Sequence, residues 1–454
     1  MQPSKNQKLN WDSLLSSKRF GSASSLPEDK MMARSQFQRD YDRIIFSSPF
    51  RRLQNKTQVF PLPGSVFVHN RLTHSLEVAS VGRSLGNVLA AELEKREELV
   101  GSDLFSMLGA IVSAACLAHD MGNPPFGHSG EKAISHYFAE GKGTMVKNMV
   151  SASEWSDLTH YEGNANAFRV LTHQFTGRRK GGFALTCATL ASLVKYPYGS
   201  DAAIGKKHKY GYFVSERETF EEIAREQGLI RLSDDPVRYC RHPLVFLVEA
   251  ADDITYQVMD VEDAHKLKIL STADTKEILM AFWNDDSEEN RLFRSNAETI
   301  FTTVTDPNEQ ISFLRAMLIN KLVGECIAVF VANYDGIMNG KYHLSLIESL
   351  EGASATAMND CKNVSVERIY NHPSVVEVEL AGYRILGALL DEFVDAALNP
   401  QSHYAKKILA LLPDQFSCPS DSSTYTQIQS ILDFVSGMTD LYALELYRKI
   451  YGIQ

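Results

Sequence analysis

Residues 104–131 read LFSMLGAIVSAACLAHDMGNPPFGHSGE, an apolar run that ends in a His-Asp pair and a loop rich in glycine and proline. The run up to His119 is apolar on nearly every side, which is typical of a helix buried in a larger body. An acidic side chain at the end of such a helix needs a partner, and a metal cation bound by His119 and Asp120 would be one. For either residue taken alone, a helix cap or a hydrogen-bonded core position is the alternative. The stretch therefore predicts a helical fold whose buried helix ends in a metal-capable pair.

The loop after this pair is restricted by two prolines and three glycines. Such a loop would present His128 and Glu131 close to the pair. An imidazole can transfer a proton near neutral pH, and a carboxylate can orient it or position a water. The alternative is an ordinary helix-turn-helix corner with Glu131 as a capping residue, but a corner requires neither the histidine nor so many restricted residues.

The rest of the chain is patterned mainly for helices. Apolar residues recur at three-to-four spacing in many segments, which predicts amphipathic or buried helices. These segments are residues 76–93, 164–173, 185–195, 243–261, 309–333, 375–397 and 425–451. Aromatic residues alternate around a glycine at 209–214, which predicts a short β-hairpin. No internal repeat or long linker separates the segments, so we expect one large helical body.

Composition excludes several classes of protein. The chain has 454 residues, of which 44% are hydrophobic and 22% charged, so it is neither disordered nor of low complexity. Its longest apolar run, residues 108–118, is well short of the ~20 residues that a membrane span requires. The first residues lack the apolar core of a signal peptide, so we expect a cytoplasmic protein with no membrane partner. The formal net charge of -10 argues against a protein that coats nucleic acid.

Two more patches carry metal-capable side chains. His74 lies at the start of the helix predicted for 76–93, and Asp252 lies within 243–261. Together with His119 and Asp120, these side chains on separate helices can converge on one cation in a bundle core. The six cysteines are scattered and form no C-x-x-C pair, so the ligands would be imidazole and carboxylate. Such ligands suit Mn, Fe, Ni, Mg or Zn.

The pattern of His74, His119-Asp120 and Asp252 resembles the H…HD…D signature of the HD-domain metal phosphohydrolases. Six longer strings, in the same order, resemble the bacterial deoxyguanosine triphosphate triphosphohydrolases. They are residues 40–59, 71–78, 119–131, 161–168, 241–254 and 437–440. The resemblance extends from about Trp11 to about Tyr451, nearly the whole chain.

The resemblance implies an all-α HD-domain helical bundle with additional helices and a short β-hairpin excursion. We expect a single unit over 1–454, with an HD core at about 66–265. The N-terminal segment 1–65 and the C-terminal helical region 266–454 would pack on this core. The resemblance also implies a homo-oligomer built from dimers into a tetramer or hexamer. Some relatives are regulated by a nucleotide at a second site, so a nucleotide or single-stranded DNA is a candidate effector of this protein.

The resemblance further implies hydrolysis of a deoxynucleoside triphosphate, with dGTP favoured, to the deoxynucleoside and tripolyphosphate, which would control nucleotide pools. A divalent metal, Mg or Mn in preference to Ni, Fe or Co, would assist water attack at the α-phosphorus. The implied metal ligands are His74, His119, Asp120 and Asp252. The implied catalytic residues are His128 and Glu131. The implied substrate contacts are Gln54, Arg71, Asn164, Lys195, Lys209, Tyr256 and Asp260.

Several alternatives stay open at this level. The enzyme could be promiscuous or activated by an allosteric nucleotide, act on another nucleotide, or be a nucleotide or single-stranded DNA-binding regulator with incidental hydrolysis. Lys195 is as well explained as a surface charge as by phosphate contact. Glu377 and Glu379 are candidates for guanine recognition, although a solvent-facing helix start explains them equally well. Leu441 follows residues 437–440 where the family often has a basic residue.

Overall fold

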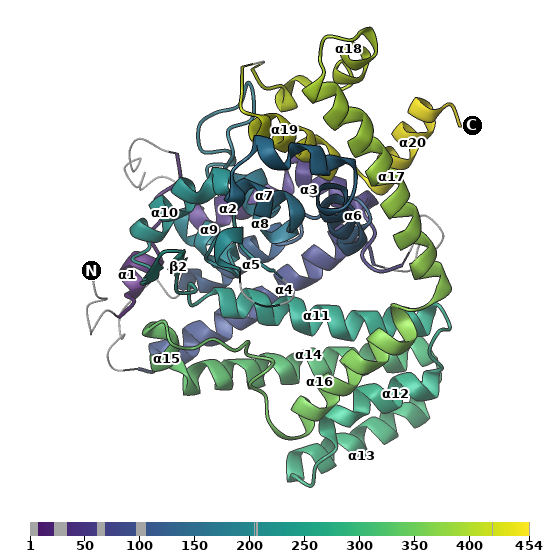
Figure 1. Ribbon diagram of the computed structural model, residues 1–454. Coiled ribbons are helices and arrows are strands. Elements are labelled where there is room, and N and C mark those ends of the chain that lie inside the picture. Colours follow the sequence, from purple (N-terminus) through teal and green to yellow (C-terminus); the bar gives the residue numbers. More distant parts are fainter. Residues whose placement is uncertain are drawn as a thin grey trace.

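The centre of the molecule is built around α4 (Arg71–Glu94) and α5 (Leu108–Ala118). The computed structural model describes residues 8–21, 34–60, 69–96, 106–203, 205, 208–419 and 421–453. Figure 1 shows α4 and α11 (Val245–Lys266) side by side across the middle of the molecule, with α14 (Pro307–Ala332) packed below them. Within the described ranges the only sheet is a two-stranded hairpin, so the all-α prediction is confirmed.

Helix α5 lies against α4 at very short range. A Cβ atom at Gly86 of α4 would lie only 2.7 Å from the Cα atom of Gly109 in α5, so glycine permits this approach of the two backbones. The helices are antiparallel, because at the other end of the contact the rings of His74 and His119 are 5.4 Å apart. Nearly every α5 residue is apolar and buried, as the sequence predicted. The packing therefore brings the His-Asp end of α5 to the first turn of α4.

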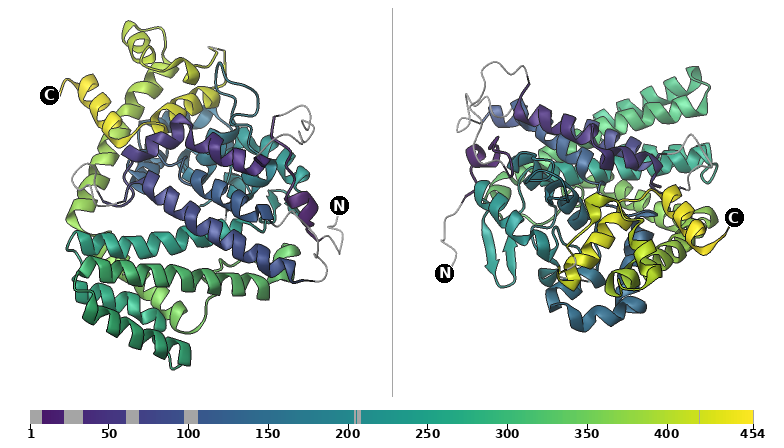
Figure 2. Two further views of the ribbon diagram at one scale, coloured as in Figure 1. Left: turned by 180° about the vertical axis from the view of Figure 1, so that it is seen from behind. Right: turned by 90° about the horizontal axis from the view of Figure 1, so that it is seen from above.

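A second apolar core lies above this centre. It joins α6 (Gly127–Ala139), α17 (Pro373–Leu398) and α19 (Thr424–Ser436) through fully buried side chains such as Ile134, Leu386 and Leu432. Helix α17 extends from the lower helices to the top of the molecule, which Figure 1 shows from the front and Figure 2 from behind. The two cores meet where α6 begins.

The remaining helices surround these two cores. On the N-terminal side and around α6 they are α1 (Trp11–Leu14), α2 (Gln36–Ile45), α3 (Ser48–Arg52), η1 (Leu53–Asn55), η4 (Lys142–Met149), α7 (Ala152–Thr159), α8 (Gly163–Thr172), α9 (Cys187–Leu193), η5 (Ser200–Ala202), η6 (Val214–Glu216) and α10 (Arg217–Glu226). In the C-terminal half they are α12 (Thr272–Met280), η7 (Ala281–Trp283), α13 (Glu288–Thr303), α15 (Tyr334–Met338), α16 (Gly352–Val364), η8 (Ser365–Ile369), α18 (His403–Leu409), η9 (Asp414–Phe416) and α20 (Asp440–Tyr451).

The β-hairpin lies elsewhere than predicted. It pairs β1 (Arg231–Asp234) with β2 (Val237–Tyr239) in antiparallel register, whereas residues 209–214 form a loop that ends in a helical turn. Tyr210, Tyr212 and Phe213 are all buried in that loop. In a half-buried strand, side chains point alternately to a buried and an exposed face. A segment that buries every aromatic side chain does not show this alternation. The prediction for 209–214 was wrong because the aromatics fill the core instead.

Most predicted helices are found with ends shifted by a few residues. The exception is residues 425–451, where the predicted single helix is wrong because α19 ends at Ser436 and α20 begins at Asp440. Thr439 caps the second helix by accepting a hydrogen bond from the amide of Tyr442 at 3.2 Å. None of the helices in the described ranges has both the length and the apolar character of a membrane span.

Candidate active site

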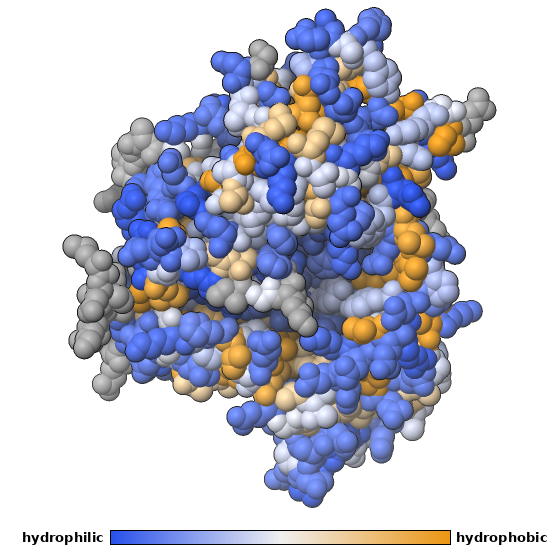
Figure 3. Space-filling view, viewed as in Figure 1, coloured by the Kyte–Doolittle hydropathy of each residue, from blue (hydrophilic) through white to orange (hydrophobic). Residues whose placement is uncertain are grey.

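A cavity of about 390 Å³ opens where α4, α5, α6 and α11 converge. Figure 3 shows this face of the molecule hollowed near its centre and bordered by hydrophilic side chains. The cavity brings together all of the predicted site residues except Gln54 and Asp260. Those that line it are Arg71, His74, His119, Asp120, His128, Glu131, Asn164, Lys195, Lys209, Asp252 and Tyr256.

The metal-capable side chains meet at one point of this cavity. His74, His119 and Asp120 each offer a ligand atom, and these atoms lie within 4.8 Å of one another. Asp252 of α11 places Oδ1 3.1 Å from His74 Nε2 and 3.4 Å from His119 Nε2. The Nδ1 of His119 is 2.6 Å from the Cys116 carbonyl, so its N–H can be donated there and its Nε2 directed to the group. Two imidazoles and two carboxylates form a donor set that fits a divalent cation.

In the metal-capable group, the carboxylates and the imidazoles shift one another's pKa. Burial opposes a charge on His119, but the carboxylates of Asp120 and Asp252 raise its pKa to about 9. Burial also opposes the charge on Asp252, yet the two imidazoles hold its pKa well below the usual range. The guanidinium of Arg71 donates to Asp120 Oδ2 at 2.8 Å. The point between the imidazoles and carboxylates therefore favours positive charge.

His128 and Glu131 form a pair on the first turn of α6. His128 Nδ1 lies 3.0 Å from Glu131 Oε2, and the other oxygen of Glu131 accepts the amide of Gly163 at 2.8 Å. The hydrogen bond to Glu131 raises the pKa of His128. Burial works against the charge on Glu131, but the contact with His128 lowers its pKa to about 2. The carboxylate is thus buried and fixed, while the His128 side chain remains 67% exposed toward the cavity.

Cationic side chains line the side of the cavity near α8 and α9. Lys209 Nζ lies 2.7 Å from Glu162 Oε2, and Glu162 Oε1 accepts the side-chain amide of Asn164 at 2.5 Å. Lys195 Nζ lies 2.9 Å from Glu249 Oε1. Each lysine is therefore held in place by a buried glutamate that also lines the cavity. Sequence reasoning missed both glutamates, although each lies within one of the strings that carried the resemblance.

Asp260 lies just behind the cavity rather than on its wall. Its Oδ2 accepts a hydrogen bond from the Tyr370 hydroxyl at 2.6 Å. The centroids of the Tyr370 and Tyr256 rings are 6.2 Å apart. Burial raises the pKa of Asp260 to about 8. Asp260 thus reaches the cavity only through the two tyrosines.

Gln54 lies outside the cavity, exposed on η1. Gln58, four residues later in the same string, lines the cavity instead, and its Oε1 is buried without a hydrogen-bond partner among the described residues. A buried amide oxygen without a partner is costly, so this oxygen is available to accept a hydrogen bond inside the cavity. Glu377 and Glu379 are exposed on α17 and do not line the cavity.

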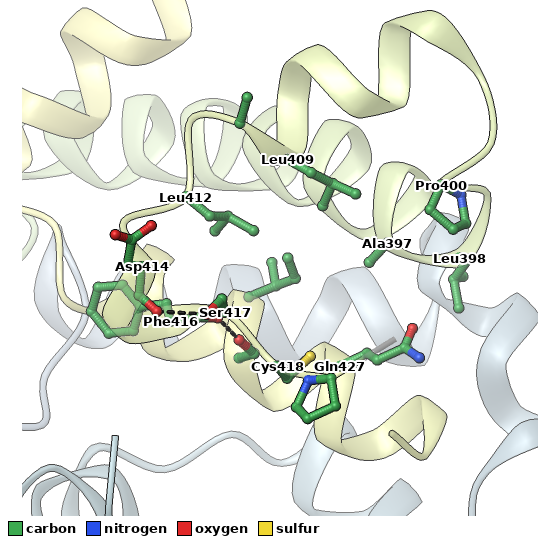
Figure 4. A pocket seen from close by; sticks show the side chains of 14 residues that line it. Ala397, Leu398, Pro400, Leu409, Leu412, Asp414, Phe416, Ser417, Cys418 and Gln427 are labelled. Carbon is green, nitrogen blue, oxygen red and sulfur yellow. Dashed lines mark hydrogen bonds between the residues drawn. The ribbon is translucent and has the colours of Figure 1, made fainter. Parts of the chain in front are cut away.

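A larger cavity of about 570 Å³ lies between the end of α17, α18 and α19 (Figure 4). Leu409, Leu412 and Phe416 give it an apolar wall, and Asp414 is the only ionisable side chain on that wall apart from the Cys418 thiol. It contains none of the predicted site residues, whereas the smaller, polar cavity contains eleven of them.

Comparison with known proteins agrees with this geometry. Residues 71–158 match the HD domain, and residues 349–449 match the phosphohydrolase-associated domain. A deoxyguanosinetriphosphate triphosphohydrolase-like protein of Synechocystis sp. is 39% identical over 98% of this chain and 100% of its own length. One of Pseudomonas aeruginosa is 38% identical over 98% and 99%.

A deoxyguanosinetriphosphate triphosphohydrolase of Salmonella paratyphi A is 31% identical over 98% of both chains. HD-domain proteins of this kind are metal-dependent phosphohydrolases, and the His and Asp group here offers the site for the metal. From the fold, the cavity and these relatives together, we conclude that the chain is a hydrolase of the deoxyguanosinetriphosphate triphosphohydrolase-like family of HD-domain phosphohydrolases.

Proposed function

We propose that the enzyme hydrolyses a deoxynucleoside triphosphate, with dGTP favoured, to the deoxynucleoside and tripolyphosphate. The observation that supports this most directly is a single cavity that joins the metal-capable group to the His128–Glu131 pair and to three cationic side chains. The cations are Arg71, Lys195 and Lys209. A nucleoside triphosphate carries a matching run of negative charge.

The metal-capable group would hold a divalent cation through His74, His119, Asp120 and Asp252. When bound, such a cation polarises a phosphate oxygen and activates water for attack at phosphorus. The bond between the α-phosphorus and the 5′-oxygen of the deoxynucleoside breaks, and protonated His128 donates its proton to that oxygen. Glu131 keeps His128 protonated and oriented through the 3.0 Å contact.

The cationic wall binds the part of the substrate that becomes tripolyphosphate. Lys195 and Lys209 would exchange part of their contact with Glu249 and Glu162 for phosphate oxygens, so little reorganisation is needed. Arg71 lines the cavity beside Asp120, where its guanidinium can contact phosphate while it orients the carboxylate. Tyr256 and Gln58 would face the sugar.

The deciding experiment supplies the purified enzyme with Mn²⁺ or Mg²⁺ and offers dGTP, dATP, dCTP, dTTP and GTP separately. The phosphate products are resolved by ion-exchange chromatography. Tripolyphosphate released mainly from dGTP, and lost in His128→Ala, supports the proposal. Release from all four deoxynucleotides keeps the reaction and removes the guanine preference. Phosphate or pyrophosphate as the product contradicts cleavage of the bond between the α-phosphorus and the 5′-oxygen.

A further inference from the structure

A lysine outside the cavity contacts the loop between α5 and α6, residues 119–126, which we call the catalytic loop. Lys56 is 2% exposed, and its ammonium donates to the carbonyls of Asn123 at 2.6 Å and Ser436 at 2.7 Å. Asn123 is in the loop between α5 and α6, whereas Ser436 is the last residue of α19. One side chain thus joins the loop to a segment more than 300 residues further along the chain.

An aspartate makes the complementary connection from the other side. Asp440 at the start of α20 accepts two hydrogen bonds from backbone amides. Its Oδ1 accepts one from Phe126 at 2.9 Å, and its Oδ2 accepts one from Thr57 at 2.8 Å. Phe126 is two residues before His128 and has a φ of 63°, a left-handed conformation that is unfavourable for a bulky residue. Its amide has to be held for that conformation to persist.

The two ends of the loop control different parts of the site. At one end, Asn123 donates its side-chain amide to Asp120 Oδ1 at 2.5 Å, so the position of this residue sets the carboxylate. At the other end, the Phe126 backbone sets the direction in which α6 begins, and with it the position of His128. Lys56 holds the first end, and Asp440 holds the second.

Stability alone would not require a lysine at position 56. Among the described residues, Lys56 hydrogen-bonds only to carbonyls and has no ion pair with a carboxylate. A buried ammonium of this kind costs several kcal/mol in desolvation unless it is well paired. Apolar side chains of similar volume often stabilise a core as well or better. Its two hydrogen bonds, one of them to the loop, therefore support a role in geometry.

We propose that Lys56 and Asp440 act together as one positioning device for the catalytic loop, here called the loop clamp. The clamp fixes Asp120 and His128 relative to each other and does not touch the substrate. This proposal rests on the proposed function, because the two residues that it positions are the implied metal ligand and proton donor.

The test compares Lys56→Met and Asp440→Ala with wild type. We expect kcat for tripolyphosphate release to fall about 10- to 100-fold in each variant, the size typical of outer-shell changes. KM should change less than about threefold, because the cationic wall is intact. The double variant should lose little more than the worse single variant, since either change already frees the loop. Losses that multiply in the double variant would show two independent roles and overturn the clamp.

Asp433→Asn is the matched control. Asp433 is a buried acid of α19, the helix that ends at Ser436. It is paired with Arg169, and among the described residues its side chain makes no hydrogen bond or ion pair with the loop. This change should lower Tm at least as much as the clamp variants while kcat per folded enzyme stays within about twofold of wild type. If kcat falls in proportion to the loss of stability in all three variants, the clamp is merely structural and the proposal fails.

A second measurement does not depend on the reaction. Amide hydrogen exchange of the metal-loaded enzyme should be at least tenfold faster for Asn123 and residues 126–128 in Asp440→Ala, and unchanged there in Asp433→Asn. Asp440→Asn, which keeps one acceptor oxygen, is the milder variant if Asp440→Ala does not fold. Unchanged exchange in a folded clamp variant overturns the proposal, whereas a wild-type enzyme that releases no tripolyphosphate overturns the proposed function alone.

Discussion

His74 and Asp252 lie 178 residues apart in the sequence, yet His74 Nε2 is 3.1 Å from Asp252 Oδ1. The contact joins α4 to α11 at the point where the end of α5 reaches both helices. The site is therefore a property of how three helices cross, and disturbing that crossing should affect both metal binding and stability.

Metal removal should lower both activity and thermal stability. We expect a chelator to abolish hydrolysis and to lower Tm, because a ligand that binds only the folded state stabilises it by mass action. Addition of Mn²⁺ should restore both in wild type but should not raise Tm in Asp252→Ala. Differential scanning calorimetry with and without Mn²⁺ checks this, and an equal rise in Tm in the variant would place the cation elsewhere.

Loss of the His128 imidazole should act on the chemical step. His128→Ala should reduce kcat by about 10²- to 10⁴-fold, the usual contribution of general acid–base catalysis. The effect on Tm should be small because the side chain is mostly exposed. Single-turnover kinetics with bound metal separate this step from product release. A variant with near wild-type kcat would assign the proton donor to another residue.

The pH dependence of kcat should depend on Glu131. The hydrogen bond to Glu131 raises the pKa of His128, so the protonated donor persists to higher pH and activity is lost as pH rises through that raised pKa. Glu131→Gln removes the negative charge and should shift the alkaline limb to lower pH. Profiles of kcat against pH for both enzymes provide the test, and coincident alkaline limbs would show that His128 does not carry the proton.

Substitution of Gln58 should change KM much more than substitution of Gln54. Gln58→Ala should raise KM for the deoxynucleoside triphosphate about 3- to 30-fold, because its buried oxygen faces the cavity without a partner. Gln54→Ala, on exposed η1, should leave KM within about twofold of wild type and serves as the control. Steady-state kinetics of the two variants decide between the two glutamines.

Arg169 should be essential for stability rather than for catalysis. It contacts both Glu216 and Asp433, and all three side chains are buried. Arg169→Met would leave two buried carboxylates without their partner and should cost about 3–5 kcal/mol in the free energy of unfolding. Urea denaturation checks the magnitude. A cost near zero would mean that water or a neighbouring group replaces the guanidinium.

The local sequence was sufficient to predict elements whose structure depends on the local apolar pattern. The apolar run before His119 predicted a buried helix, and α5 is one, because a helix that is apolar on every side can lie only in the interior. Where sequence reasoning went wrong, at residues 209–214 and across 437–439, the outcome depended on which neighbours the segment packs against. Aromatic spacing does not reveal that all of the aromatics are buried, and the apolar pattern of 425–451 does not reveal the break.

The sequence by itself determined the helical fold, the family, and the kinds of side chain at the site, because these follow from periodicity and from short strings of neighbouring residues. Only the tertiary structure decided which members of those strings reach the cavity. It selected Gln58 over Gln54 and paired the lysines with buried glutamates. It also placed Lys56 and Asp440 behind the catalytic loop. The physical reason is that such contacts join residues from tens to hundreds of positions apart, and their geometry is set by how helices pack rather than by any local preference of the chain.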